Sequence, residues 1–161
     1  MDFIEHGLYN IKDSYFENFP SKYFSDNKKE KRPHYYAFKD SDGILWCIPL
    51  SSQTSAYELK IKQYLENHKI CIFYHIGKIN GVDRVFLIGN MFPVTEEYIK
   101  KPFTISKVHY VVKNKLLIKE IQKRAKKYIT LVKYKKLKPN VNIMQIKEIL
   151  MNNKLNGSDA K

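Results

Sequence analysis

The sequence predicts an α+β fold, in which a small, strongly bent antiparallel sheet or partial β-barrel carries a long basic C-terminal helix and a second short helix. Strand-like runs joined by Asp-Gly and Asn-Gly turns fill most of the first hundred residues. Residues 106–134 instead contain no Gly or Pro and repeat apolar residues at helical spacing. A chain of 161 residues is long enough for a real core, so we expect one domain spanning residues 1–161.

The first elements follow from alternation and turn residues. Residues 7–12 are typical of a short strand, and residues 15–19 of one helical turn. Residues 25–32 are charged and lack periodicity, which indicates a mobile loop. Two aromatic-rich runs, residues 34–39 and 44–50, flank Asp42-Gly43 and predict a hairpin. A second hairpin is predicted across Asn80-Gly81.

The helices carry different signals. The stretch Ser55-Ala56-Tyr57-Glu58 has the form of a capping box, so Ser55 should cap a helix that runs to about residue 68. The long helix over residues 106–134 should bury one face and expose the other. A shorter helix is expected in residues 140–152, and residues 156–161 should be frayed. The buried face comprises Leu117, Ile121, Ala125, Tyr128 and Val132, and the exposed face carries Lys115, Lys119, Lys123 and Lys126.

The net charge of +13 is unevenly distributed. Residues 1–100 hold 13 basic and 13 acidic side chains, whereas residues 101–161 hold 16 and 3. This asymmetry indicates a polyanionic partner, most often a nucleic acid. An acidic membrane surface is disfavoured, because the basic stretch lacks the exposed apolar face of an interfacial helix. The candidate RNA-binding residues are Lys28, Lys29, Lys31, Arg32, Lys113, Lys115, Lys119, Lys123, Arg124, Lys126 and Lys127.

Several features predict a cytoplasmic protein. No apolar run approaches the ~18 residues that a membrane span needs. The N-terminus carries acidic residues where a signal peptide would have positive charge followed by an apolar stretch. Cys47 and Cys71 both lie in apolar runs, as reduced, buried thiols do.

The sequence predicts no metal site and no cofactor. The pairs Asp40 with Asp42 and Glu96 with Glu97 have no further acids nearby, so they are poor candidates for holding Mg²⁺. The spacing of His68, Cys71 and His75 lacks the second ligand cluster that a zinc site needs.

RNA can nevertheless be cleaved without a metal, because its own 2′-hydroxyl can attack the neighbouring phosphate. A protein must then align the reacting atoms, move protons and stabilise negative charge. Ser51, Ser52, Thr54 and Ser55 crowd four hydroxyls into five positions after Pro49. Hydroxyl residues before a helix are ordinarily turn and cap residues, and the sequence pattern alone does not distinguish that role from catalysis.

The stretches "PHYYAF", "LWCIPLSSQT" and "RVFLIGNMFPV" resemble the toxins of type III toxin–antitoxin systems, the ToxN/AbiQ family and, more closely, its CptN-like branch. The resemblance implies a MazF/Kid-like barrel core and a sequence-specific, metal-independent endoribonuclease that leaves 2′,3′-cyclic phosphate and 5′-hydroxyl ends. It further implies a role in phage defence and two RNA partners. One is target mRNA; the other is an inhibitory antitoxin RNA of pseudoknot repeats, held in a closed protein–RNA assembly. Because such an RNA must occupy the catalytic groove without being consumed there, we also expect the toxin to process its precursor and to retain the product through many phosphate contacts.

The resemblance also implies roles for individual residues. The family motif Pro-Leu-Thr/Ser-Ser falls on residues 49–52, which gives Ser52 the central catalytic position and Ser51 the flanking one. Thr54 stands where relatives have a lysine. A basic residue that follows a proline in the family corresponds to His34, which could exchange protons near neutral pH, and an N-terminal tyrosine corresponds to Tyr15.

Two other functions compete with this one. A non-catalytic module that binds structured RNA would need only the C-terminal charge. A MazF-like toxin restrained by a protein antitoxin would not need the lysine-rich helix face, so we expect no protein antitoxin and no membrane partner.

Overall fold

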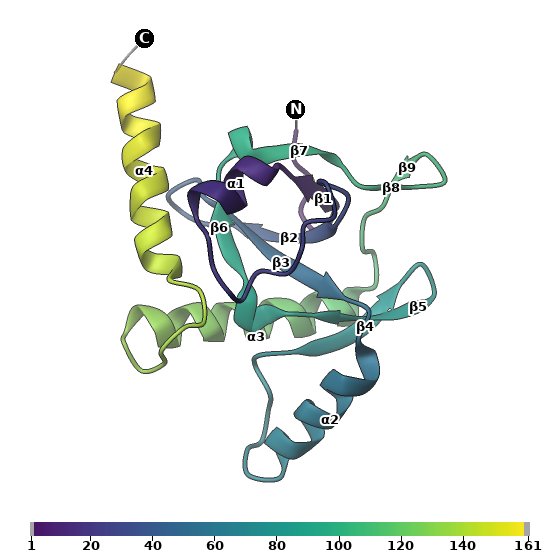
Figure 1. Ribbon diagram of the computed structural model, residues 1–161. Coiled ribbons are helices and arrows are strands. Elements are labelled where there is room, and N and C mark those ends of the chain that lie inside the picture. Colours follow the sequence, from purple (N-terminus) through teal and green to yellow (C-terminus); the bar gives the residue numbers. More distant parts are fainter. Residues whose placement is uncertain (1, 160–161) are drawn as a thin grey trace.

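The computed structural model describes residues 2–159, which form an α+β fold built around one antiparallel sheet (Figure 1). The sheet has seven strands in the order β4-β5-β3-β2-β1-β7, and β6 also pairs with β3. Both predicted hairpins are confirmed: β2 pairs with β3, and β4 with β5. The strands are β1 (Leu8–Ile11), β2 (Pro33–Lys39), β3 (Leu45–Ser51), β4 (His75–Ile79), β5 (Val82–Phe86), β6 (Phe92–Val94) and β7 (Ile99–Pro102).

Strand β3 is the centre of the sheet because it pairs with three other strands. Its first half pairs with β6, from Leu45 opposite Val94 to Cys47 opposite Phe92. Its last two residues pair with β5 instead, with Ser51 opposite Val85. One edge of β3 therefore changes its partner strand from β6 to β5 along its length.

A two-stranded ribbon occupies the place where the sequence predicted the start of the long helix. Strands β8 (Thr104–Ile105) and β9 (Val108–His109) pair across Ser106 and Lys107, whose φ angles are 53° and 65°. Left-handed conformations at both central residues are what a tight hairpin turn requires. The predicted helix start at residue 106 is therefore wrong, because this turn forms without the Gly or Asn that usually announces one.

Four α-helices surround the sheet: α1 (Asp13–Asn18), α2 (Thr54–Leu65), α3 (Lys115–Lys133) and α4 (Ile143–Asp159). Short 3₁₀ turns lie at Ile88–Asn90 and Glu96–Tyr98. In Figure 1, α3 runs beneath the sheet, α4 stands beside it and α2 projects away from it.

Two predicted helix ends are wrong. Helix α2 begins at Thr54 after Gln53, with no side-chain cap, so Ser55 lies inside the helix rather than capping it. Helix α4 continues through residues 156–159, where fraying was expected, and residues 160–161 lie outside the described residues. Ile143, Ile146 and Leu150 are buried and fix the first half of α4, whereas residues 152–157 are exposed.

Helix α3 has the two faces that its sequence predicts. Asn114 caps it by accepting a hydrogen bond from the Leu117 N–H at 3.1 Å. All five predicted core residues of the helix are buried, and the four predicted lysines are exposed. Strand β4 approaches the helix at Gly77, where any added Cβ would overlap the Leu117 side chain.

Replacing Gly77 with alanine should lower the free energy of unfolding by about 1–3 kcal/mol, because the new methyl group overpacks against Leu117. Urea unfolding measures this loss. The matched control is Gly157→Ala on α4, which faces open space and should be neutral or slightly stabilising. In a Leu117→Ala background the loss should shrink; an equal loss in both backgrounds would contradict the overlap as its cause.

Candidate active site

A groove of about 710 Å³ opens at the C-terminal end of β3. Residues 50–53 meet there with the segment before β2 and with the β4–β5 turn. Leu8, Leu50, Leu87 and Phe103 contribute apolar surface. The polar residues that line the groove are Ser51, Ser52, Gln53, Tyr57, Asn80, Ser25, Asp26, Lys28, Lys31, Arg32 and Arg84. Hydroxyls and cations therefore share one depression.

Ser51 and Ser52 lie in this groove because β3 ends between them. The half-buried Ser51 accepts a hydrogen bond from the Gln53 N–H through its Oγ at 3.1 Å, which turns the chain toward α2. Ser52 is exposed, and its hydroxyl makes no hydrogen bond to any described residue. Thr54 donates its N–H to the Ser52 carbonyl at 2.9 Å but does not line the groove.

His34 lies in the core instead. Its side chain is 2% exposed and packs between Phe16, at 5.8 Å between ring centroids, and Phe92, at 5.5 Å. Burial lowers the pKa of His34 to about 3, and the neighbouring positive charge of Arg32 acts in the same direction. The expectation that His34 exchanges protons with a substrate does not fit this placement, because the ring is neutral near pH 7 and shielded from solvent.

Tyr15 is also a core residue. Its side chain is fully buried in α1, and its hydroxyl donates a hydrogen bond to the Pro93 carbonyl at 2.7 Å. The ring packs against Phe19, Phe92 and Tyr98. Burial raises the pKa of Tyr15 well above its usual value. Tyr15 thus attaches α1 to β6, and it does not reach the groove that holds Ser52.

The charged segment 25–32, expected to be mobile, is anchored. Buried Asn27 donates to the Ile11 carbonyl at 2.8 Å and to the Asp13 carboxylate at 2.9 Å. Glu30 accepts from the Asp13 N–H at 2.8 Å and from Lys100 at 2.7 Å. Residues 28–30 have φ angles of 51°, 56° and 66°, a conformation that costs about 1–2 kcal/mol per residue without glycine. These anchoring hydrogen bonds offset that cost and fix the turn.

Arg32 emerges from this turn into the groove. Its Nη2 donates to the Leu50 carbonyl at 2.7 Å, and its Nη1 makes a longer contact of 3.4 Å to the Asp26 carbonyl. The Nε is buried without a hydrogen-bond partner among the described residues. Burial lowers the pKa of Arg32, opposed by the nearby Asp26, but a guanidinium keeps its charge in proteins.

Sequence reasoning did not identify six of the polar residues that line the groove: Ser25, Asp26, Gln53, Tyr57, Asn80 and Arg84. Asn80 and Arg84 come from the β4–β5 hairpin, and Tyr57 from the first turns of α2. Asn80 signalled only a turn, and Tyr57 was read as part of a capping box. The Tyr57 ring packs on Tyr74 at 4.7 Å, with the Lys60 ammonium 4.8 Å from its centroid. The proximity of Asn80 and Arg84 to Ser52 depends on tertiary contacts that no local pattern contains.

The basic surface extends beyond the groove. A neighbouring depression of about 380 Å³ shares Lys31 and Phe103 with it and adds Lys29, Lys100 and Lys101. Glu30, paired with Lys100, contributes the carboxylate of this depression. Positive charge therefore continues from the hydroxyls toward β7.

Helix α3 carries a separate basic surface. Lys115, Lys119, Lys123 and Lys126 line a shallow hollow of about 380 Å³ together with Ile118 and Gln122. Lys113 and Lys127 are exposed as well. Arg124 does not fit the RNA-binding expectation, because its Nε donates to the Cys71 carbonyl at 2.9 Å and its Nη1 pairs with Glu120.

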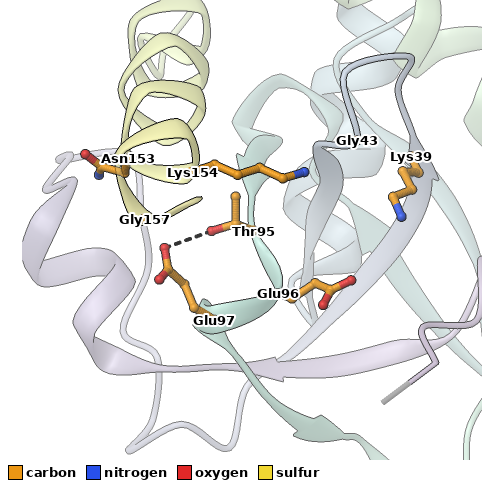
Figure 2. Close-up of a pocket in the computed structure, with 8 residues that line it drawn as sticks. All are labelled: Lys39, Gly43, Thr95, Glu96, Glu97, Asn153, Lys154 and Gly157. Carbon is orange, nitrogen blue, oxygen red and sulfur yellow. Dashed lines mark hydrogen bonds between the residues drawn. The ribbon is translucent and has the colours of Figure 1, made fainter. Parts of the chain in front are cut away.

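Figure 2 shows another cavity, of about 480 Å³, between α4, the β2–β3 turn and the 3₁₀ turn at Glu96–Tyr98. Glu96 and Glu97 lie here with Lys39 and Lys154, and Thr95 donates a hydrogen bond to Glu97 at 3.1 Å. Carboxylates and ammonium groups are mixed in this cavity, and none of the predicted catalytic residues lines it. The groove at Ser52 is the better candidate for RNA.

Within residues 2–159, no three His, Cys, Asp or Glu side chains gather in a way that could hold a metal ion. None of the described helices is both long and apolar enough to cross a membrane.

Burial of His34 should make stability depend on pH. In the unfolded chain the imidazole takes up a proton below its ordinary pKa of 6.5, whereas the folded ring stays neutral to about pH 3. Stability is therefore complete above pH 6.5 and is lost as the pH falls. From pH 7 to pH 5 the loss should be about 2 kcal/mol.

The His34→Phe variant lacks this titration and can occupy the same aromatic cluster. Urea unfolding at both pH values should show a smaller loss in the variant than in the wild type, by roughly the same 2 kcal/mol. Identical pH dependence in the two proteins would contradict the buried, neutral state of His34.

Comparison with solved structures places the fold. AbiQ, a lactococcal anti-phage endoribonuclease belonging to the type III toxin–antitoxin system, matches with a TM-score of 0.60 and 16% sequence identity. The match covers 91% of this chain and 97% of AbiQ. No protein-family model matches the sequence, and no curated protein sequence matches it either. This chain thus has the fold of AbiQ over most of its length, and its groove at Ser51 and Ser52 is the candidate active site.

Proposed function

We propose that this protein is a cytoplasmic, sequence-specific endoribonuclease toxin of a type III toxin–antitoxin system, of the CptN-like branch of the ToxN/AbiQ family. The observation that carries the proposal is the combination of an AbiQ-like fold with a cation-lined groove at the serine pair where β3 ends. The fold makes RNA cleavage the leading activity, and the groove supplies the groups that a metal-independent reaction needs. Phage defence would be the biological role, as it is for AbiQ.

The proposed reaction is an internal transesterification of RNA. The 2′-oxygen bonds to the adjacent phosphorus while the bond from phosphorus to the 5′-oxygen breaks. One proton leaves the 2′-oxygen and another reaches the 5′-oxygen, so the products carry a 2′,3′-cyclic phosphate and a 5′-hydroxyl. Each proton is exchanged with water, either directly or through a groove hydroxyl that contacts the 2′- or 5′-oxygen.

Ser52 is the hydroxyl best suited to a direct part in this reaction. Ser52 is exposed in the groove and its Oγ makes no hydrogen bond to a described residue, so it can both accept and donate a hydrogen bond to RNA. Ser51 is held by the Gln53 N–H, which suits a positioning role. Thr54 supports the turn through the Ser52 carbonyl. We assign His34 and Tyr15 to support of the groove from the core.

The partner proposed for the α3 lysines is an antitoxin RNA of pseudoknot repeats. A folded RNA presents many phosphates at fixed spacing, and several contacts made together bind more tightly than single ones. The toxin would process its precursor and hold the repeats in a closed protein–RNA assembly. Target mRNA would occupy only the groove, and neither a protein antitoxin nor a membrane is needed.

Replacing Ser52 with alanine should abolish RNA cleavage and growth arrest, since the groove loses its free hydroxyl. Ser55→Ala is the matched control, because Ser55 is exposed inside α2 and does not line the groove. Cleavage by the wild type should proceed in excess EDTA and leave cyclic phosphate ends. Full activity of Ser52→Ala would contradict the assigned site, and loss of wild-type activity in EDTA would contradict the metal-independent reaction.

Binding of antitoxin RNA should weaken steeply as salt increases. Changing Lys119, Lys123 and Lys126 together to glutamine should flatten the log–log slope by about 0.7–0.9 for each phosphate that the variant no longer neutralises. Filter binding at several salt concentrations measures this slope for the wild type and for the variant. The control is a triple glutamine variant at Lys22, Lys62 and Lys69, which are equally exposed but lie outside every basic depression described above. Equal slopes in the two variants would leave the α3 lysines as ordinary solvated surface.

A further inference from the structure

Four cations line the groove beside the serine pair, and they are not equivalent. Lys28 and Lys31 are exposed, and the Arg84 guanidinium turns back to the carbonyl of its neighbour Asp83 at 3.0 Å. Arg32 is half-buried, and its Nη2 donates a 2.7 Å hydrogen bond to the Leu50 carbonyl. Leu50 directly precedes Ser51, so this contact holds a positive charge within one residue of the hydroxyl pair.

We infer that Arg32 is a catalytic residue, whose guanidinium contacts the scissile phosphate and stabilises the negative charge that develops as the 2′-oxygen attacks. The inference rests on the proposed RNA cleavage and assigns a role to a residue for which the sequence suggested only RNA binding.

The guanidinium has donors to spare for a phosphate. Of its five N–H groups, one of those on Nη2 is committed to Leu50. The Nη1 contact to the Asp26 carbonyl is 3.4 Å long, near the limit of a hydrogen bond. A phosphate oxygen that replaces this weak contact would receive a charge-assisted hydrogen bond, which is stronger than the one it displaces.

The backbone that carries Arg32 is held by hydrogen bonds. The Arg32 and Lys31 N–H groups both donate to the Asn27 carbonyl at 3.2 Å, and Asn27 is itself buried and bonded to Ile11 and Asp13. The charge is therefore in place before RNA binds, as electrostatic stabilisation of a transition state requires. The exposed lysines would first have to give up side-chain freedom.

Arg32 also supplies a positive charge that the first turn of the neighbouring helix α2 does not have. The first turn of α2 approaches Ser52 with Thr54 and Ser55, which are uncharged. Lys60, farther along α2, lies over the Tyr57 ring. Arg32, which immediately precedes β2, instead brings a positive charge to the Leu50 carbonyl, next to the serine pair.

In the reaction, the phosphorus gains the bond to the 2′-oxygen and loses the bond to the 5′-oxygen. Between these events, negative charge concentrates on its non-bridging oxygens, which Arg32 would contact. Arg32 neither gives nor takes a proton, because its pKa stays far above the working range even when burial lowers it. Its loss should therefore reduce the rate at every pH without changing the shape of the pH profile.

The test begins with a short RNA that contains a cleavage site mapped with the wild-type protein. Cleavage of this RNA is then measured for the wild type and for Arg32→Ala, Arg32→Lys and Arg32→Gln. We expect Arg32→Ala to lower kcat by about 100- to 1000-fold, the range seen when one transition-state donor is removed, with a smaller change in KM. Millimolar guanidinium ion should restore part of the Arg32→Ala activity and should not restore that of Ser52→Ala.

The lysine and glutamine variants separate charge from anchoring. Glutamine keeps a neutral N–H donor on a shorter side chain, whereas lysine keeps the positive charge. Arg32→Lys should retain at least tenfold more activity than Arg32→Gln at comparable stability in urea. Equal activity of these two variants, or Arg32→Ala within threefold of the wild type, would overturn the catalytic role.

A wild-type protein that cleaves no RNA would instead refute the proposed function itself. If Arg32→Ala fails to fold, the lysine–glutamine comparison decides the question alone. Lys22→Ala, an exposed change outside the groove, is the control for the effect of removing a positive charge and should cleave like the wild type.

Discussion

The groove depends on the change of partners along β3. One edge of this strand pairs with β2 from Leu45 to Pro49, and the other edge pairs first with β6 and then with β5. Pro49 lies at the change and has no N–H to donate, while its carbonyl accepts from the Leu87 N–H at 2.9 Å. A proline inside a sheet is tolerated where the ladder is interrupted. The strand then ends at Ser51, which is half-buried, and the next residue, Ser52, is exposed to solvent.

The aromatic cluster beneath β2 explains why residues that resemble catalytic ones are structural here. His34 and Tyr15 both pack against Phe92, and each has a polar atom that the core must accommodate. Tyr15 satisfies its hydroxyl at Pro93, whereas the His34 Nδ1 is buried without a hydrogen-bond partner among the described residues. Burial keeps both side chains uncharged near neutral pH, since it disfavours their ionised forms. Through their shared contact with Phe92, they link α1 and β2 within the core.

Positive charge is organised on two surfaces of different origin. The α3 lysines belong to the C-terminal third, where the net charge alone indicated a polyanionic partner. The groove cations belong to residues 1–100, whose formal charge sums to zero. The net charge of this stretch does not reveal them, because its 13 acidic side chains cancel its 13 basic ones, while the fold gathers Lys28, Lys31, Arg32 and Arg84 in one groove with a single acid among the described residues that line it, Asp26. A neutral stretch of sequence can therefore form a strongly basic site.

The sequence by itself determined the elements that local chemistry specifies. The Asp-Gly and Asn-Gly turns fixed both hairpins, and the spacing of Leu117, Ile121, Ala125, Tyr128 and Val132 fixed the buried face of α3. It also marked Ser51 and Ser52 as a candidate site, through a family motif, and the structure places both in the groove.

Tertiary structure decided everything that depends on distant contacts. The turn at Ser106 and Lys107, the anchoring of the 25–32 segment by Asn27, and the burial of His34 all carry no local signature. The same holds for the meeting of Arg32 with Tyr57 and Arg84 in one groove, since the sequence marked Arg32 for RNA binding but not as a neighbour of these two residues. The physical reason is that turns and helix faces are set by interactions over a few residues. Burial and charge around a site are instead set by which strands pair, and here β3 joins segments from both halves of the chain.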